Sequence, residues 1–262
     1  MIAPFLLAVS AYGVAFAAFV APSDRARQQI GAARAVLALG AVFHLACVGV
    51  QCADGQHPFS SIYLSMSLGA WLAVIGYLAL SGARRPMRPI GAVFAPVAIA
   101  ALTLGFVLGP QPHPTTSVSH GLLWLHISLA IVGVAGFSLA TAVAALYLSF
   151  ERRLRRREFY PKRPGMSLVG LDRLHWWLVA GVTPVFTIAV ATGAVAAVQT
   201  GGSEMLSARV LELSASAVAC LASVAVLASR AVWGLRGRRA AWLTMVCFAS
   251  LVVIAISYGV RT

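Results

Sequence analysis

The chain has 262 residues, of which 60% are hydrophobic and only 10% are charged, and its mean hydropathy is +0.87. A soluble globule needs more polar surface than this, so the composition excludes that class and favours a protein folded in a bilayer. The formal net charge of +13 does not indicate nucleic-acid binding. The basic residues lie in short segments between apolar runs, where they report membrane topology.

Eight apolar runs, each near or above the length of about 20 residues that spans a bilayer, follow one another along the chain. They are residues 2–21, 31–50, 61–80, 90–109, 122–150, 174–198, 209–231 and 240–260. The first run has no basic segment before it and no clear cleavage site after it, so we expect it to remain as a membrane anchor. The pattern predicts an all-α fold, a polytopic membrane helical bundle of eight transmembrane helices, with residues 1–262 forming a single transmembrane domain.

The basic residues predict how these helices are oriented. Of the 20 lysines and arginines, three precede or enter the second run, three separate the third and fourth, eight lie in residues 152–173, and four separate the seventh and eighth. The positive-inside rule assigns these segments to the cytoplasm. Both termini are then external, as are the segments near residues 51–60, 110–121 and 199–208. We expect a multi-pass protein of a bacterial-type inner membrane, whose arginine run ERRLRRR touches anionic headgroups.

The histidines provide the clearest chemical signal, because imidazole is a versatile metal ligand and is costly to leave unpaired in hydrocarbon. His126 lies roughly 9 Å along the fifth run from His120, and His44 lies at a similar distance from the outer end of its run. The two side chains are therefore candidates for the axial ligands of one haem iron at a shared depth. The alternative is that each imidazole bonds to a carbonyl or hydroxyl of a neighbouring helix.

Other catalytic and metal-binding patterns do not occur in the sequence. The four cysteines include no Cys-x-x-Cys pair, and three of them lie inside apolar runs. We find no nucleophile triad, phosphate-binding glycine loop or metalloprotease helix. The sequence therefore predicts a protein that is not an enzyme.

Four segments together resemble a known family. In chain order they are HPFSSIYLSMSLGAW (57–71), LLWLHISLAIVGVAGFSLATAVAALYL (122–148), LVGLDRLHWWLVAGVTPVFTIAVATG (168–193) and WGLRGRRAAWL (233–243). They resemble the cytochrome c assembly membrane proteins of the CcsA superfamily, and within it the short HemX or YpjD type. The resemblance covers most of the chain from about residue 31, and its most specific parts are the GLRGRRAAW turn and the histidine-led fifth run.

The resemblance implies a protein that binds or handles haem in cytochrome c assembly or its regulation, with other membrane proteins of that process as partners. His126 matches the external-side histidine that the family carries at the head of this span. Two features differ from the family. The family has a tryptophan-rich segment between its sixth and seventh spans, whereas the segment here, VQTGGSEMLSA (198–208), contains no tryptophan. The family also has a second external histidine near the end of the seventh span, and Ala228 aligns with it. The alternative function is that of a haem-free membrane interaction protein that stabilises or regulates another membrane complex.

Overall fold

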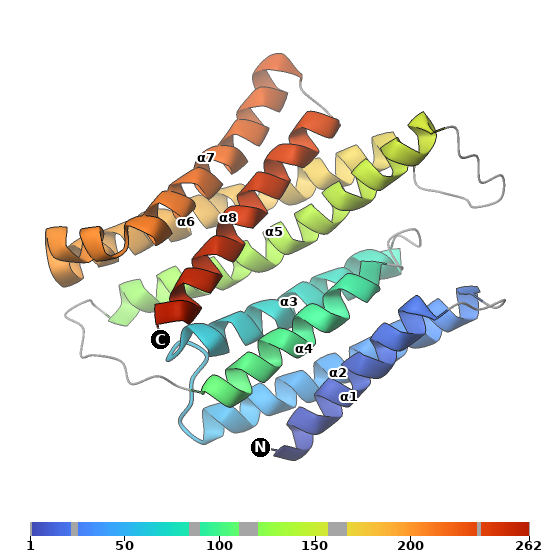
Figure 1. Cartoon of the computed structure of the whole chain (residues 1–262), viewed down its shortest axis with the longest axis horizontal. Coiled ribbons are helices and arrows are strands. Elements are labelled where there is room, and N and C mark those ends of the chain that lie inside the picture. Colours follow the sequence, from blue (N-terminus) through green and yellow to red (C-terminus); the bar gives the residue numbers. More distant parts are fainter. Residues whose placement is uncertain are drawn as a thin grey trace. The chain divides into compact units, whose positions relative to one another are not determined.

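The computed structural model describes residues 2–21, 26–83, 90–109, 120–156, 167–234 and 237–261. These residues form eight helices (Figure 1): α1 Ile2–Val20, α2 Ala26–Ala53, α3 Ile62–Ala83, α4 Gly91–Leu108, α5 His120–Arg155, α6 Leu168–Ala208, α7 Val210–Trp233 and α8 Arg238–Arg261. Every one of the eight is long and apolar enough to cross a membrane. The predicted all-α fold with eight membrane spans is therefore confirmed.

Two helices extend well past their predicted ends. The α5 helix has 36 residues and continues beyond Phe150, where Glu151 and Arg155 form an ion pair one turn apart. The α6 helix has 41 residues and continues to Ala208, so the expectation of a loop at 199–208 is wrong, whereas the external location of this segment stays a prediction. Residues 199–208 contain no proline, and each of their two glycines costs a helix only about 1 kcal/mol.

The helices group into two compact units, residues 1–114 and 115–262, while the assignment of a single domain stays a prediction. In the first unit, α1 packs against α2 and α4, and α3 packs against α4. Aromatic rings fill this core: Phe5 stacks on Phe106 with ring centroids 4.1 Å apart, and Tyr77 stacks on Phe94 at 5.4 Å. The α2 helix approaches α1 closely at Gly40, because this residue has no side chain. A Cβ atom there would lie 2.7 Å from the Tyr12 ring.

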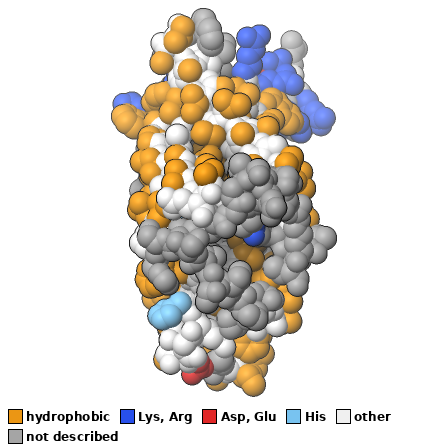
Figure 2. Space-filling view, turned by 90° about the vertical axis from the view of Figure 1, so that its left-hand side faces the viewer, with side chains coloured by type: hydrophobic (Ala, Val, Ile, Leu, Met, Phe, Trp, Pro, Cys, Tyr) orange, Lys and Arg blue, Asp and Glu red, His pale blue; other side chains and the backbone are white. Residues whose placement is uncertain are grey.

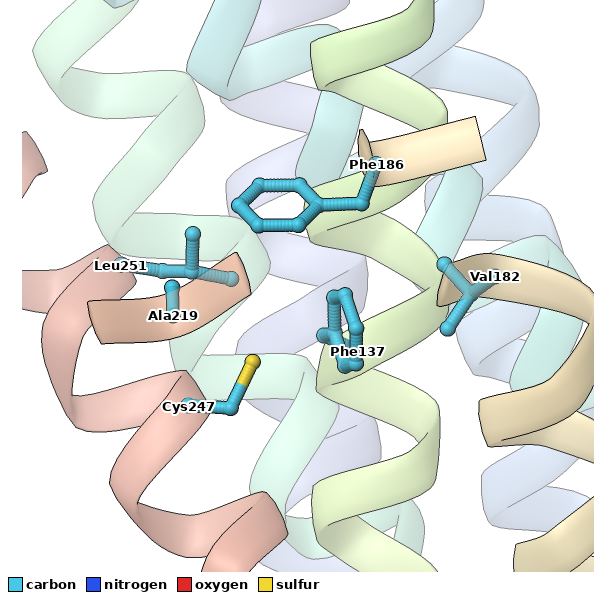
Figure 3. Packing of buried hydrophobic residues seen from close by; sticks show 6 residues of the cluster. All are labelled: Phe137, Val182, Phe186, Ala219, Cys247 and Leu251. Atoms are coloured by element: carbon cyan, nitrogen blue, oxygen red, sulfur yellow. The ribbon is translucent and has the colours of Figure 1, made fainter. Parts of the chain in front are cut away.

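In the second unit, α5 packs against α6 and α8, and α7 packs against α6 and α8. Figure 3 shows the central cluster, to which all four helices contribute: Phe137, Val182, Phe186, Ala219, Cys247 and Leu251. The rings of Phe137 and Phe186 meet edge to face, with centroids 5.3 Å apart. A Cβ atom at Gly136 would lie 2.5 Å from Val182, so this glycine sets the close approach of α5 and α6.

Within each unit, the segments predicted to be cytoplasmic lie at one end. In the first unit, Arg34 near the start of α2 donates to Ser81 Oγ and to the carbonyl of Leu78 near the end of α3. In the second, arginines from the end of α5 and the start of α8 line one hollow. Figure 2 shows hydrophobic side chains over much of the described surface. The assignment of these ends to the cytoplasm, with external termini, stays a prediction.

Candidate functional site

His126 lies on α5 and makes one hydrogen bond to α6. Its Nδ1 is 2.7 Å from the carbonyl oxygen of Ala189. A carbonyl oxygen only accepts, so Nδ1 must carry the proton and donate it. In a neutral ring, Nε2 then has a lone pair, and no partner among the described residues bonds to it. The ring is only partly buried, so a ligand can approach this nitrogen.

A glycine on α6 makes room for the His126 ring. Gly193 lies one turn beyond Ala189, and a Cβ atom there would be 2.5 Å from Cε1 of His126 and 2.9 Å from its Nδ1. Real Cβ atoms do not approach this closely, so any larger residue at 193 would displace the ring. The carbonyl of Ala189 and the bare backbone of Gly193 together fix where the imidazole lies.

His44 has different surroundings in the first unit. It is fully buried, its Nδ1 lies 3.2 Å from the hydroxyl oxygen of Tyr12, and its Nε2 lies 2.9 Å from Ser67 Oγ. Both ring nitrogens are therefore occupied by hydroxyls of α1 and α3. His126 and His44 each bond to a carbonyl or a hydroxyl of a neighbouring helix, as the alternative to haem binding predicted. The sharing of one haem iron by His44 and His126 stays a prediction.

The remaining histidines contribute no further ligand set. His175 is buried on α6 with its Nε2 2.9 Å from Thr244 Oγ1 of α8. His113 and the side chain of His120 lie outside what the structure describes. Across the described residues, no group of three or more His, Cys, Asp or Glu side chains is arranged to hold a metal ion.

A charged clamp that sequence reasoning missed holds the opposite end of the second unit. Asp172 of α6 pairs with Arg230 of α7, with Nη1 to Oδ2 at 3.1 Å. The other carboxylate oxygen accepts the backbone N–H of Gly237 at 2.8 Å. The guanidinium of Arg230 also lies over the Trp176 ring, 4.7 Å from its centroid. A usable signal was present, since Asp172 is one of only seven acidic residues and stands at the entry to an apolar helix.

The clamp fixes the turn between α7 and α8. Gly234 ends α7 in the left-handed conformation with φ 59°, and its N–H donates to the carbonyl of Ser229. Gly237 has φ 72°, and a Cβ atom there would meet the Tyr147 hydroxyl oxygen at 2.5 Å. Gly234 is required for its backbone conformation. Gly237 is required for its backbone conformation and because the Tyr147 hydroxyl leaves no space for a side chain.

A family model described as "Cytochrome C assembly protein" matches residues 59–262. The chain belongs to this family. No curated protein and no solved structure matches the chain. The match contains His126 and the whole Asp172 clamp, whereas His44 precedes it.

Membership of the cytochrome c assembly family supports a role in cytochrome c maturation for this multi-pass membrane protein. Two of the four segments that resemble the family, residues 168–193 and 233–243, meet through the bond from Gly237 to Asp172. They therefore form one structural element, which holds the membrane helices together. The narrower HemX or YpjD type stays a prediction.

The structure also locates Ala228, the position aligned with a second external histidine of the family, and that alignment stays a prediction. Ala228 lies two residues before Arg230, which pairs with Asp172 near the start of α6. His126 bonds to Ala189, about 25 Å farther along that helix. Ala228 and His126 thus lie toward opposite ends of the second unit, so no side chain at 228 can share a ligand with His126.

Proposed function

We propose that this cytochrome c assembly protein binds haem through Nε2 of His126, and that its role is to hold haem without catalysing a reaction. The observation that carries the proposal is the 2.7 Å hydrogen bond from Nδ1 of His126 to the Ala189 carbonyl. Metal-ligating histidines typically donate their other ring N–H to a carbonyl or carboxylate, which fixes the tautomer and the ring orientation. His126 already has this arrangement before any ligand is considered.

The residues around His126 suit its proposed role as a ligand to the haem iron. A bound haem would supply its own redox chemistry, with four iron ligands from the porphyrin, so the chain would need to contribute only a donor such as His126 and apolar contacts. Leu123 and Leu129 lie three residues before and after His126 on α5, on the same face of the helix, and both are partly exposed. They provide apolar surface for a porphyrin edge, and the partial burial of His126 lets its free nitrogen be reached.

His44 is the weaker of the two candidate ligands. Binding iron would require it to release Tyr12 or Ser67, at a cost of about 1 kcal/mol for the bond and more for the hydroxyl left unpaired. We therefore expect haem binding to depend on His126 and to survive His44→Ala. A His44→Ala variant whose spectrum changes as much as that of His126→Ala would support the shared-haem form of the proposal instead.

The test is the absorption spectrum of the purified, haem-loaded protein. We expect a Soret band that is lost in His126→Gly and restored when imidazole is added, because free imidazole can fill the space left by the side chain. Restoration separates ligation from a purely structural role. His57→Gly, in an exposed loop of the first unit, serves as the control and should keep the native spectrum.

The second candidate function is a haem-free protein that stabilises another membrane complex. The closed hydrogen bonding of His44 favours it, because that side chain is fully explained by packing and needs no ligand. A purified protein that stays colourless after haem loading, and copurifies with another membrane protein of cytochrome c assembly, would support this function. It would also contradict the proposed haem site.

A further inference from the structure

A hollow of about 220 Å³ lies where the end of α5 meets the start of α8. Four arginines line it: Arg152, Arg155, Arg156 and Arg238. Arg152 and Arg155 belong to the last turn of α5 and Arg156 follows directly after it, whereas Arg238 is the first residue of α8 and is distant in the sequence. Folding of the second unit therefore brings like charges together at the end of two membrane spans.

Most of this positive charge has no partner among the residues that the structure describes. Glu151 pairs with Arg155 at 2.9 Å. None of Arg152, Arg156 and Arg238 makes an ion pair with a described residue. Three converging guanidinium groups repel one another, and a bound anion removes that repulsion. Guanidinium donors form a fork that matches phosphate oxygens, so a phosphate is the anion that this lining fits best.

Apart from Glu151, which also lines the hollow and is paired with Arg155, the rest of the lining is apolar and leads into the membrane span. Leu148 and Trp242 complete the hollow, and Trp242 is 46% exposed. Val246, four residues later and thus on the same face of α8, is 47% exposed. A strip of exposed apolar surface therefore runs from the arginines along α8, and a tryptophan at this level is typical of the membrane interface.

We propose that this hollow is a binding site for one anionic phospholipid. Its phosphate binds Arg152, Arg156 and Arg238, and an acyl chain lies along Trp242 and Val246. The apolar strip favours a lipid over free phosphate, because inorganic phosphate gains nothing from exposed indole and valine side chains. This site is independent of His126 and of haem binding.

The experiment compares two variants that remove the same charge from the same helices. Arg152→Gln with Arg238→Gln changes two residues that line the hollow, and Arg153→Gln with Arg239→Gln changes their exposed neighbours, which do not line it. Native mass spectrometry of the full chain, released from nanodiscs of phosphatidylcholine and phosphatidylglycerol, reports retained phosphatidylglycerol. We expect the first variant to lower retention about tenfold and the second less than twofold, since charge-assisted bonds are lost only in the first.

Three results would overturn the proposal. Equal losses in both variants would indicate diffuse attraction between arginines and headgroups, and no loss in either would exclude the site. Displacement of phosphatidylglycerol by millimolar inorganic phosphate would assign the hollow to free phosphate. Trp242→Ala tests the apolar part of the site. It should lower phosphatidylglycerol retention and leave the melting temperature in phosphatidylcholine unchanged.

Discussion

The two units satisfy their buried polar groups in different ways. In the first unit, the ring of His44 lies between the hydroxyls of Tyr12 and Ser67, and all three side chains are neutral bonding partners within the core. In the second, an ion pair between Asp172 and Arg230 holds one end, and His126 toward the other end uses one ring nitrogen only. The first arrangement is closed, whereas the second leaves one lone pair available.

This difference separates stability from ligand binding. A closed network gains nothing from an added ligand, because every donor and acceptor already has a partner. A histidine fixed by one bond, with its second nitrogen free, is ordered for binding before the ligand arrives. The comparison therefore explains His44 by the packing of the first unit and supports the proposal that His126 binds a ligand.

The largest expected effect comes from the clamp. Asp172→Ala leaves Arg230 without its carboxylate and the N–H of Gly237 without its acceptor, so we expect a loss of about 2 to 3 kcal/mol. Glu151→Ala is the control: it removes an ion pair whose Arg155 side chain is 69% exposed, at a cost below about 0.5 kcal/mol. Unfolding in mixed micelles measures both. Similar losses would mean that the clamp is no stronger than a surface pair.

A smaller effect is expected in the closed network. Tyr12→Phe removes the hydroxyl that bonds to Nδ1 of His44 and keeps the ring in the core, so we expect a loss of about 1 kcal/mol. The haem spectrum should stay the same. A spectral change in this variant would link the first unit to the haem site and would break the division between the two histidines.

The smallest effect on stability, with a clear effect on the spectrum, is expected at Gly193. Gly193→Ala places a methyl group against the His126 ring and must turn it, so the Soret band should shift while stability changes by less than about 1 kcal/mol. Gly181→Ala is the matched control on the same helix, because nothing lies within 4 Å of its added Cβ. An unshifted band in Gly193→Ala would show that the orientation of His126 does not matter for haem.

Hydropathy was sufficient to predict the eight helices, because each span must be apolar on nearly all sides to face lipid. Hydropathy did not predict the helix ends. Residues 199–208 are polar enough to suggest a loop, yet α6 continues through them to Ala208. Side-chain partners were also hidden. Tyr12 and Ser67 lie on other helices than His44, and no spacing within one span indicates which of its faces meet them.

The candidate site was predicted in part. The depth of His126 and its place in a family segment singled it out, but its bond to Ala189 and the space over Gly193 depend on how α5 and α6 pack. The clamp was missed because Asp172 and Arg230 are far apart in the sequence and Arg230 was treated only as a topology signal. An isolated acidic residue at the start of an apolar helix is a reason to search the remaining helices for its cation.

The clamp also bears on the order in which the chain enters the membrane. Asp172 leaves the ribosome well before Arg230, and a lone charged residue costs a membrane helix up to about 3 kcal/mol, less near its ends. We therefore expect the start of α6 to settle in the membrane only after the hairpin of α7 and α8 has brought both the guanidinium and the N–H of Gly237. A product that stops before residue 230 lacks both partners of Asp172, so we expect its carboxylate to stay unpaired.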